Sequence, residues 1–186
     1  MGNIGDILYF TIEEIGKEKI QTDITFNVGL SVQYIDMILD RCKKVLDPAN
    51  EENVGSLCEA LLHFMITTCT LPSARKVMVG KVNLDIVIPS LNVLGSFPEK
   101  AIIIQIVKNS QTLTEYQLKD ISTIQPNPNN IWAVSSEPAS GNYVNYTVES
   151  GKSKIDSFQR RNFRNIIVDI KSFLQKTNDK SFRFFH

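Results

Sequence analysis

Two stretches of sequence decide the fold: Val82-Asn83-Leu84-Asp85-Ile86-Val87-Ile88-Pro89 and Ala101-Ile102-Ile103-Ile104-Gln105-Ile106-Val107-Lys108. The second stretch is almost wholly β-branched, which predicts a central strand covered on both faces. The first stretch follows Lys76-Val77-Met78-Val79-Gly80, and the tight turn near Gly80-Lys81 predicts a β-hairpin. We therefore expect the central strand to pair with the hairpin strand that carries Asp85.

The sequence around these strands predicts an α/β fold with a mixed central β-sheet flanked by helices. Apolar residues at helical spacing predict helices over 31–46, after Asn50, from Thr112 or Thr114 to Ile124, and over 155–176. Further strands are expected at 131–135 and, at the edge of the sheet, at 143–148. The loop-like residues 95–98 separate the two deciding stretches.

The domain organisation that we expect is one α/β domain over residues 31–186, preceded by an N-terminal segment over 1–30. Residues 7–12 have strand composition, and residues 24–28 alternate weakly between apolar and polar. The N-terminal segment is therefore expected to form a small hairpin or an irregular arm.

The composition is that of an ordinary globular protein. The chain has 186 residues, of which 42% are hydrophobic, and its 20 basic and 20 acidic residues cancel to a net charge of zero. The three cysteines, Cys42, Cys58 and Cys69, form no CxxC pair, which favours a reducing compartment and a cytoplasmic location. No apolar run reaches the roughly 18 residues of a membrane span, so no membrane association is expected.

The charges are distributed unevenly along the chain. Residues 1–70 contain 11 acidic and 5 basic residues, a net charge of −6, whereas residues 152–186 contain 9 basic and 3 acidic residues, a net charge of +6. The two ends could attract each other within the fold or across a dimer, or the basic end could meet nucleic-acid phosphates. For the second case, Arg160, Arg161 and Arg164 are the candidate contacts, and Arg160 and Arg164 would share one helix face.

The order of elements from about residue 50 to residue 135 resembles the core of the PD-(D/E)XK, or restriction-endonuclease-like, nuclease superfamily. That core has a helix, a hairpin carrying an Asp, and a central strand carrying an acid and a Lys. Asp85 stands in the hairpin, and Gln105 and Lys108 stand on the central strand 20 and 23 residues later. The resemblance implies a restriction-endonuclease-like core and hydrolysis of phosphodiesters with a bound Mg²⁺ ion, which activates water.

The motif departs from the family's pattern, in which one residue separates the acid and the Lys so that both lie on one strand face. If Lys108 keeps its register, the acid position is Ile106; if Gln105 keeps it, the Lys position is Val107. At least one catalytic group is missing in either register, unless a bulge turns the end of the strand. The active site is therefore expected to be degenerate.

Glu59 offers a compensation, because some superfamily members take an extra carboxylate from the helix before the hairpin. The resemblance then assigns roles: Asp85 as metal ligand, Glu59 as helper carboxylate, Gln105 as neutral ligand and Lys108 as the cation that orients water. Such a set would hold Mg²⁺ only weakly, since at most two groups are anionic. Alternatively, Glu59 pairs with His63 on the helix surface, Asp85 is a turn residue and Lys108 caps a strand end.

Two functions remain open from the sequence. The first is a nuclease-like protein that binds DNA or RNA, with weakened or lost metal-dependent phosphodiester hydrolysis. The second is a non-catalytic interaction protein, dimeric or an accessory subunit, that retains the nuclease-like fold.

Overall fold

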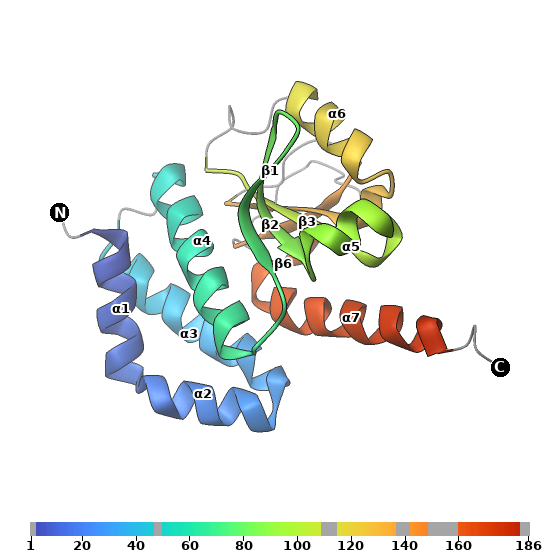
Figure 1. Cartoon of the computed structure of the whole chain (residues 1–186). Coiled ribbons are helices and arrows are strands. Elements are labelled where there is room, and N and C mark those ends of the chain that lie inside the picture. The colour runs from blue at the N-terminus through green and yellow to red at the C-terminus, as the bar shows by residue number, and fades with distance from the viewer. Residues whose placement is uncertain (1–2, 47–49, 109–114, 137–141, 149–159, 183–186) are drawn as a thin grey trace.

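The computed structural model describes residues 3–46, 50–108, 115–136, 142–148 and 160–182 (Figure 1). The strands are β1 (Ala74–Val79), β2 (Val82–Ile88), β3 (Ile102–Ile106), β4 (Ile131–Ser135), β5 (Val144–Thr147) and β6 (Arg160–Asn162). The α-helices are α1 (Ile4–Ile15), α2 (Lys17–Phe26), α3 (Ser31–Lys43), α4 (Glu51–Thr68), α5 (Leu91–Ser96), α6 (Glu115–Ile124) and α7 (Ile166–Phe182). Short 3-10 helices are η1 (Val28–Leu30), η2 (Pro98–Lys100), η3 (Pro128–Asn130) and η4 (Phe163–Asn165).

The six strands form one mixed sheet in the order β1-β2-β3-β4-β5-β6. The pairs β1–β2 and β2–β3 are antiparallel, and the pairs from β3 to β6 are parallel. The predicted central strand is confirmed, because Ile104 of β3 faces Ile86 of β2 on one side and Trp132 of β4 on the other. The mixed α/β sheet expected from the sequence is likewise confirmed.

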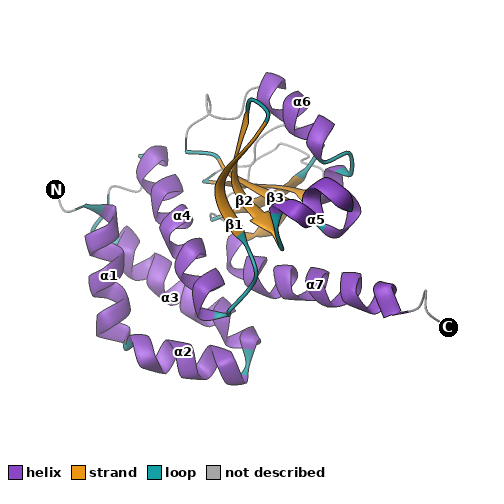
Figure 2. Cartoon of the chain, viewed as in Figure 1, coloured by secondary structure: helices purple, strands orange, loops and turns teal. Residues whose placement is uncertain are grey.

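Helices cover both faces of the sheet (Figure 2). On one face, Ile102, Ile104 and Ile106 of β3 belong to the core that α1, α2, α3, α4 and α7 complete. On the other face, Ile103 and Val107 belong to a smaller core with residues of α5 and α6. The alternation along β3 thus divides the protein into two apolar layers.

The hairpin or irregular arm expected over residues 1–30 is wrong for the described residues, which form α1 and α2. Asn3 caps α1, because its side chain accepts a hydrogen bond from the backbone N–H of Gly5 at 3.2 Å. Leu8 and Ile12 are four residues apart and are buried in the larger core. Burial at helical spacing outweighs the strand composition of this segment.

The C-terminal helix is shorter than expected. It begins at Ile166, whereas Arg160–Asn162 forms strand β6, which pairs in parallel with β5. The predictions of a helix through residues 160–165 and of an edge position for 143–148 are therefore wrong, because β5 has a neighbour on each side. Residues 155–159 lie outside the described residues.

The ends of several helices differ from or agree with the sequence patterns one by one. Helix α4 begins directly after Asn50, as expected, and the structure shows that the Asn50 side chain caps it by accepting hydrogen bonds from the N–H groups of Glu52 and Asn53. The segment 95–98 is not wholly a loop, because α5 extends to Ser96. Thr112 and Thr114, the caps expected for the next helix, lie outside the described residues. Of the helices in the described ranges, none is long and apolar enough to cross a membrane.

Candidate functional site

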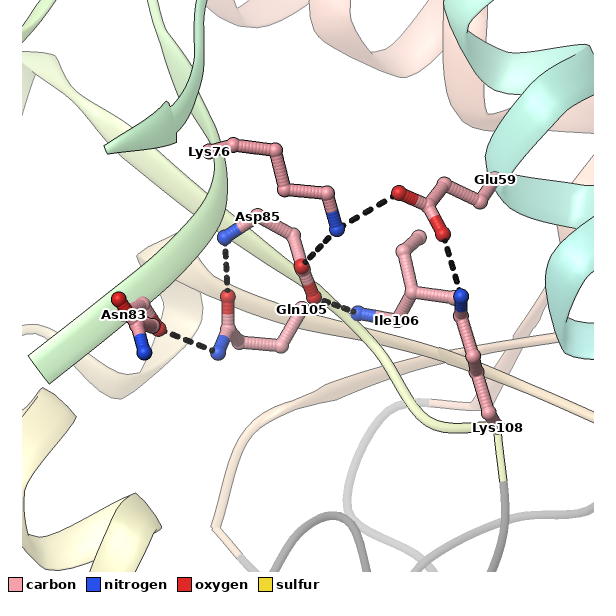
Figure 3. A network of polar contacts seen from close by, with 7 residues as sticks. All are labelled: Glu59, Lys76, Asn83, Asp85, Gln105, Ile106 and Lys108. Atoms are coloured by element: carbon pink, nitrogen blue, oxygen red, sulfur yellow. Dashed lines mark hydrogen bonds and ion pairs between the residues drawn. The ribbon is translucent and has the colours of Figure 1, made fainter. Parts of the chain in front are cut away.

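The structure brings together side chains from helix α4, from the hairpin and from the end of β3 (Figure 3). Glu59 lies on α4, Asp85 on β2, and Lys108 two residues beyond β3. Lys76 of β1 connects them: its Nζ atom lies 2.6 Å from Glu59 Oε1 and 2.7 Å from Asp85 Oδ1. The second oxygen of Glu59, Oε2, lies 2.8 Å from Lys108 Nζ. We call Glu59, Lys76, Asp85 and Lys108 the ion-pair network.

Sequence reasoning missed Lys76, although a signal for it was present. The hairpin register pairs Val79 with Val82 and Val77 with Leu84, which leaves Lys76 opposite Asp85. The predicted turn near Gly80-Lys81 implies the same register, so the position of Lys76 beside Asp85 could have been deduced.

The hairpin is distorted where Lys76 and Asp85 face each other. Lys76 has a backbone φ of 48°, in the left-handed region that residues other than glycine rarely adopt. Leu84 and Val87 are three residues apart, yet both belong to the smaller core. In a regular strand, side chains three residues apart point to opposite faces of the sheet. The regular alternation of side chains along β2 is therefore interrupted at Asp85.

This distortion turns the Asp85 carboxylate into the gap between β2 and β3. Asp85 Oδ2 accepts a hydrogen bond from the backbone N–H of Ile106 at 2.8 Å. In return, Gln105 Oε1 accepts one from the backbone N–H of Asp85 at 2.7 Å, and Gln105 Nε2 donates to the Asn83 carbonyl at 3.1 Å. Around Asp85 and Gln105, side chains thus take the place of ladder hydrogen bonds, whereas the two strands pair through their backbones from Ile86–Ile104 to Ile88–Ile102.

The position of Gln105 bears on the two registers considered for the motif. The carbonyl oxygen and the amide nitrogen of its side chain both form hydrogen bonds with the backbone of β2, at Asp85 and at Asn83. Neither of these two hydrogen bonds connects Gln105 to Glu59. Ile106, in contrast, is buried on the sheet face toward α4, in the same core as α4 residues. An apolar side chain therefore stands on the face where the family's second acid would be expected.

The charges of the ion-pair network stabilise one another. Burial raises the pKa of Glu59, but the hydrogen bonds and charges of Lys108 and Lys76 outweigh it and hold the pKa below its ordinary value of 4.5. Burial lowers the pKa of Lys76, but its hydrogen bonds to Asp85 and Glu59 raise it above the ordinary value of 10.5. Glu59 is thus an anion and Lys76 a cation at neutral pH.

The donor set does not fit a divalent ion. Each of the four carboxylate oxygens of Glu59 and Asp85 already accepts from a lysine ammonium or from the N–H of Ile106. Within the described ranges, no group of three or more His, Cys, Asp or Glu side chains is placed to hold a metal. The two carboxylates do come together, as expected, but around an ammonium group.

The three arginines considered for phosphate contacts do not lie on one helix. Arg160 and Arg161 belong to β6 and Arg164 to η4, so the expected one-turn spacing of Arg160 and Arg164 is wrong. Arg160 Nε donates to Thr147 Oγ1 at 3.3 Å. Because these side chains come from a strand and the turn after it, they do not form the predicted helical clamp.

Two of these arginines form ion pairs within the chain. Arg161 Nη1 lies 3.1 Å from Asp169 Oδ2, and the same carboxylate oxygen accepts from the Tyr146 hydroxyl at 2.7 Å. Arg164 Nη1 lies 3.0 Å from Asp36 Oδ2. The Arg164–Asp36 pair joins the basic C-terminal part to the acidic N-terminal part, one of the two arrangements expected from the charge distribution.

The comparisons with known proteins bear on the fold. No family profile and no curated protein matches the sequence. A solved structure described as metal-depleted Ecl18kI in complex with uncleaved, modified DNA superposes with a TM-score of 0.60 at 11% identity, covering 96% of this chain and 80% of that chain. A second, metal-depleted Ecl18kI in complex with uncleaved DNA, gives a TM-score of 0.53 at 12% identity, with 95% and 80% covered.

Ecl18kI is a PD-(D/E)XK restriction endonuclease. The likeness extends over nearly the whole of this chain, including the N-terminal helices that the sequence did not predict. The chain therefore has a restriction-endonuclease-like fold, as the hairpin and the central strand predicted.

Proposed function

We propose that this protein binds DNA through the surface around the ion-pair network and that its phosphodiester hydrolysis is weakened or lost. The observation that carries the proposal is that the network balances its charges: two carboxylates face two ammonium groups. The likeness of the fold to two DNA complexes supports the choice of DNA as partner.

The lysines of the network are the groups that would meet a phosphate. The side chain of Lys76 is 56% exposed and that of Lys108 is 35% exposed, whereas Glu59 is only 15% exposed. The ammonium groups can therefore face solvent while the carboxylates lie behind them. Because the carboxylates offset much of this charge, binding is expected to be weak and to weaken further as the salt concentration rises.

Hydrolysis requires a base or an ion that activates water. The oxygens of Asp85 and Glu59 are engaged by the lysines and by the Ile106 N–H, so accepting a proton from water would require breaking an ion pair. This arrangement favours binding over cleavage.

The test is fluorescence anisotropy with labelled duplex DNA, single-stranded DNA and RNA, in EDTA and at low salt. Lys108→Ala should weaken binding to all sequences and reduce the slope of log affinity against log salt by about 0.9 on duplex DNA. Lys81→Ala, at the exposed hairpin turn, is the matched control and should leave the slope unchanged. Equal slopes for wild type and Lys108→Ala would contradict the proposed surface.

Cleavage is measured separately, by nicking of supercoiled plasmid with Mg²⁺ or Mn²⁺. We expect nicking to be slow or absent in the wild type and unchanged in Asp85→Ala. Rapid nicking that Asp85→Ala abolishes would show that the hydrolytic activity is retained.

A second function, that of a non-catalytic interaction protein, is favoured by the ion pairs of Arg161 and Arg164 with aspartates of the same chain. These pairs reduce the positive charge available to nucleic acid. No binding of any of the three nucleic acids at micromolar protein would leave this function standing. Sedimentation velocity would then test whether the partner is a second copy of the chain.

A further inference from the structure

Lys76 places its ammonium group between the two carboxylates that the fold would use for a metal. Its Nζ atom lies 2.6 Å from Glu59 Oε1 and 2.7 Å from Asp85 Oδ1, so it bridges helix α4 and strand β2 (Figure 3). Mg²⁺ binds carboxylate oxygens at about 2.0–2.1 Å. The distances from the Lys76 nitrogen to the two carboxylate oxygens are longer than this and are those of hydrogen bonds to an ammonium group.

The backbone of β1 is held in an unusual conformation at this residue. Lys76 has a φ of 48° and is opposite Asp85 in the hairpin register. Such a conformation costs free energy for a residue with a side chain and persists where surrounding contacts maintain it. The contacts of Lys76 include the two ion pairs of its ammonium group.

The net charge of the ion-pair network is already zero, which disfavours the binding of a further cation. Glu59 and Asp85 contribute two negative charges, and Lys76 and Lys108 contribute two positive charges. Three ion pairs link them: Lys76 with Glu59, Lys76 with Asp85, and Lys108 with Glu59. A divalent ion between the carboxylates would replace Lys76 or meet its repulsion at close range, where Coulomb energies are largest.

From this geometry we infer that Lys76 is the resident cation of the site and takes the place of the divalent ion. Its ammonium group holds α4 and the hairpin together and excludes Mg²⁺ and Mn²⁺ from the wild-type protein. The inference deepens the proposed function and rests on it for the choice of this network as the site. It follows that removing the charge of Lys76 alone creates a divalent-cation site between Glu59 and Asp85.

The test is isothermal titration calorimetry of Mn²⁺ into the protein, without nucleic acid. Four proteins are compared: wild type, Lys76→Met, Lys81→Met, and the double variant Lys76→Met with Glu59→Gln. Methionine keeps the apolar stem of the lysine and removes its charge. Lys81→Met is the matched control, because it removes one exposed lysine charge from the same hairpin.

We expect Lys76→Met to bind one Mn²⁺ per chain at least about tenfold more tightly than wild type, because a unit positive charge close to the ion has been removed. Lys81→Met should behave like wild type, and the added Glu59→Gln should abolish the gained binding. Wild type that binds Mn²⁺ as tightly as Lys76→Met would overturn the inference. So would a Lys76→Met protein that folds and binds Mn²⁺ no better than Lys81→Met.

Lys76→Met leaves two carboxylates without their shared counter-ion and could unfold. In that case the far-ultraviolet circular dichroism of the variant is followed as Mn²⁺ is added. Recovery of the helical signal supports the inference, and its absence overturns it. The DNA measurements in EDTA stay independent: failure to bind DNA would refute the proposed function alone, and tight Mn²⁺ binding by wild type would refute this inference alone.

Discussion

Gly55 allows α4 to approach the end of the central strand, and replacing it with alanine is a sharp test of this packing. A Cβ atom built on Gly55 would lie 2.8 Å from the Cα of Lys108 and 3.1 Å from its Cγ. Ordinary contacts of such atoms begin near 3.4 Å. Because the nearest atom is backbone, α4 and the end of β3 would have to separate by roughly half an ångström.

The expected cost can be worked out from two opposing effects. Overpacking a well-packed site destabilises a protein by about 1–3 kcal/mol. The higher helix propensity of alanine offsets about 1 kcal/mol of this. We therefore expect Gly55→Ala to lower the free energy of unfolding by up to about 2 kcal/mol.

Gly95→Ala is the matched control, because Gly95 also lies in a helix, is exposed, and has no described atom within 4 Å of a built Cβ. It should stabilise the protein slightly, since only the gain in helix propensity applies. Urea denaturation followed by circular dichroism measures both variants. If Gly55→Ala is as stable as Gly95→Ala, the close packing of α4 on Lys108 is refuted.

Three further variants test the core and the polar networks. Ile104→Asp should cost several kcal/mol or prevent folding, because it buries an unpaired charge in β3, and thermal unfolding would measure this. Tyr146→Phe should cost about 1–2 kcal/mol in urea denaturation, because Asp169 loses the hydrogen bond from the Tyr146 hydroxyl while its contact with Arg161 remains. Glu59→Gln should reduce stability most above pH 4.5, the ordinary pKa of the group. Because the folded-state pKa is lowered, the stabilisation by the carboxylate is lost as pH falls through it, so denaturation midpoints of wild type and variant should converge in acid. A constant difference across pH would contradict the role of this ion pair.

The centre of the sheet could be predicted because its signals are local. The apolar run of β3 is continuous, and the turn near Gly80-Lys81 determines the hairpin register. Together with the helix predicted to start after Asn50, these elements bring Glu59 and Asp85 close together. The same register places Lys76 opposite Asp85. No sequence pattern, however, indicates that the backbone of Lys76 adopts the left-handed conformation.

The ends of the chain could not be predicted in the same way. Residues 7–12 combine strand composition with helical spacing, and only the core beneath α1 decides between them. Strand β6 is three residues long and contains two arginines, so its own sequence does not favour a strand. It forms because its backbone can hydrogen-bond with the backbone N–H and C=O groups of β5. Interactions of this kind are set by tertiary structure and leave little trace in a single sequence.

The pairing of Asp36 with Arg164 has a consequence for how the protein folds. It links residues that are 128 positions apart, and Ile166 and Ile170 of α7 share one core with Ile35 and Ile38 of α3. During synthesis, the N-terminal helices therefore emerge long before the segment that completes their core. Contacts of such large sequence separation slow folding. A nascent chain that stops before Ile166 is expected to expose apolar surface and to need protection from aggregation.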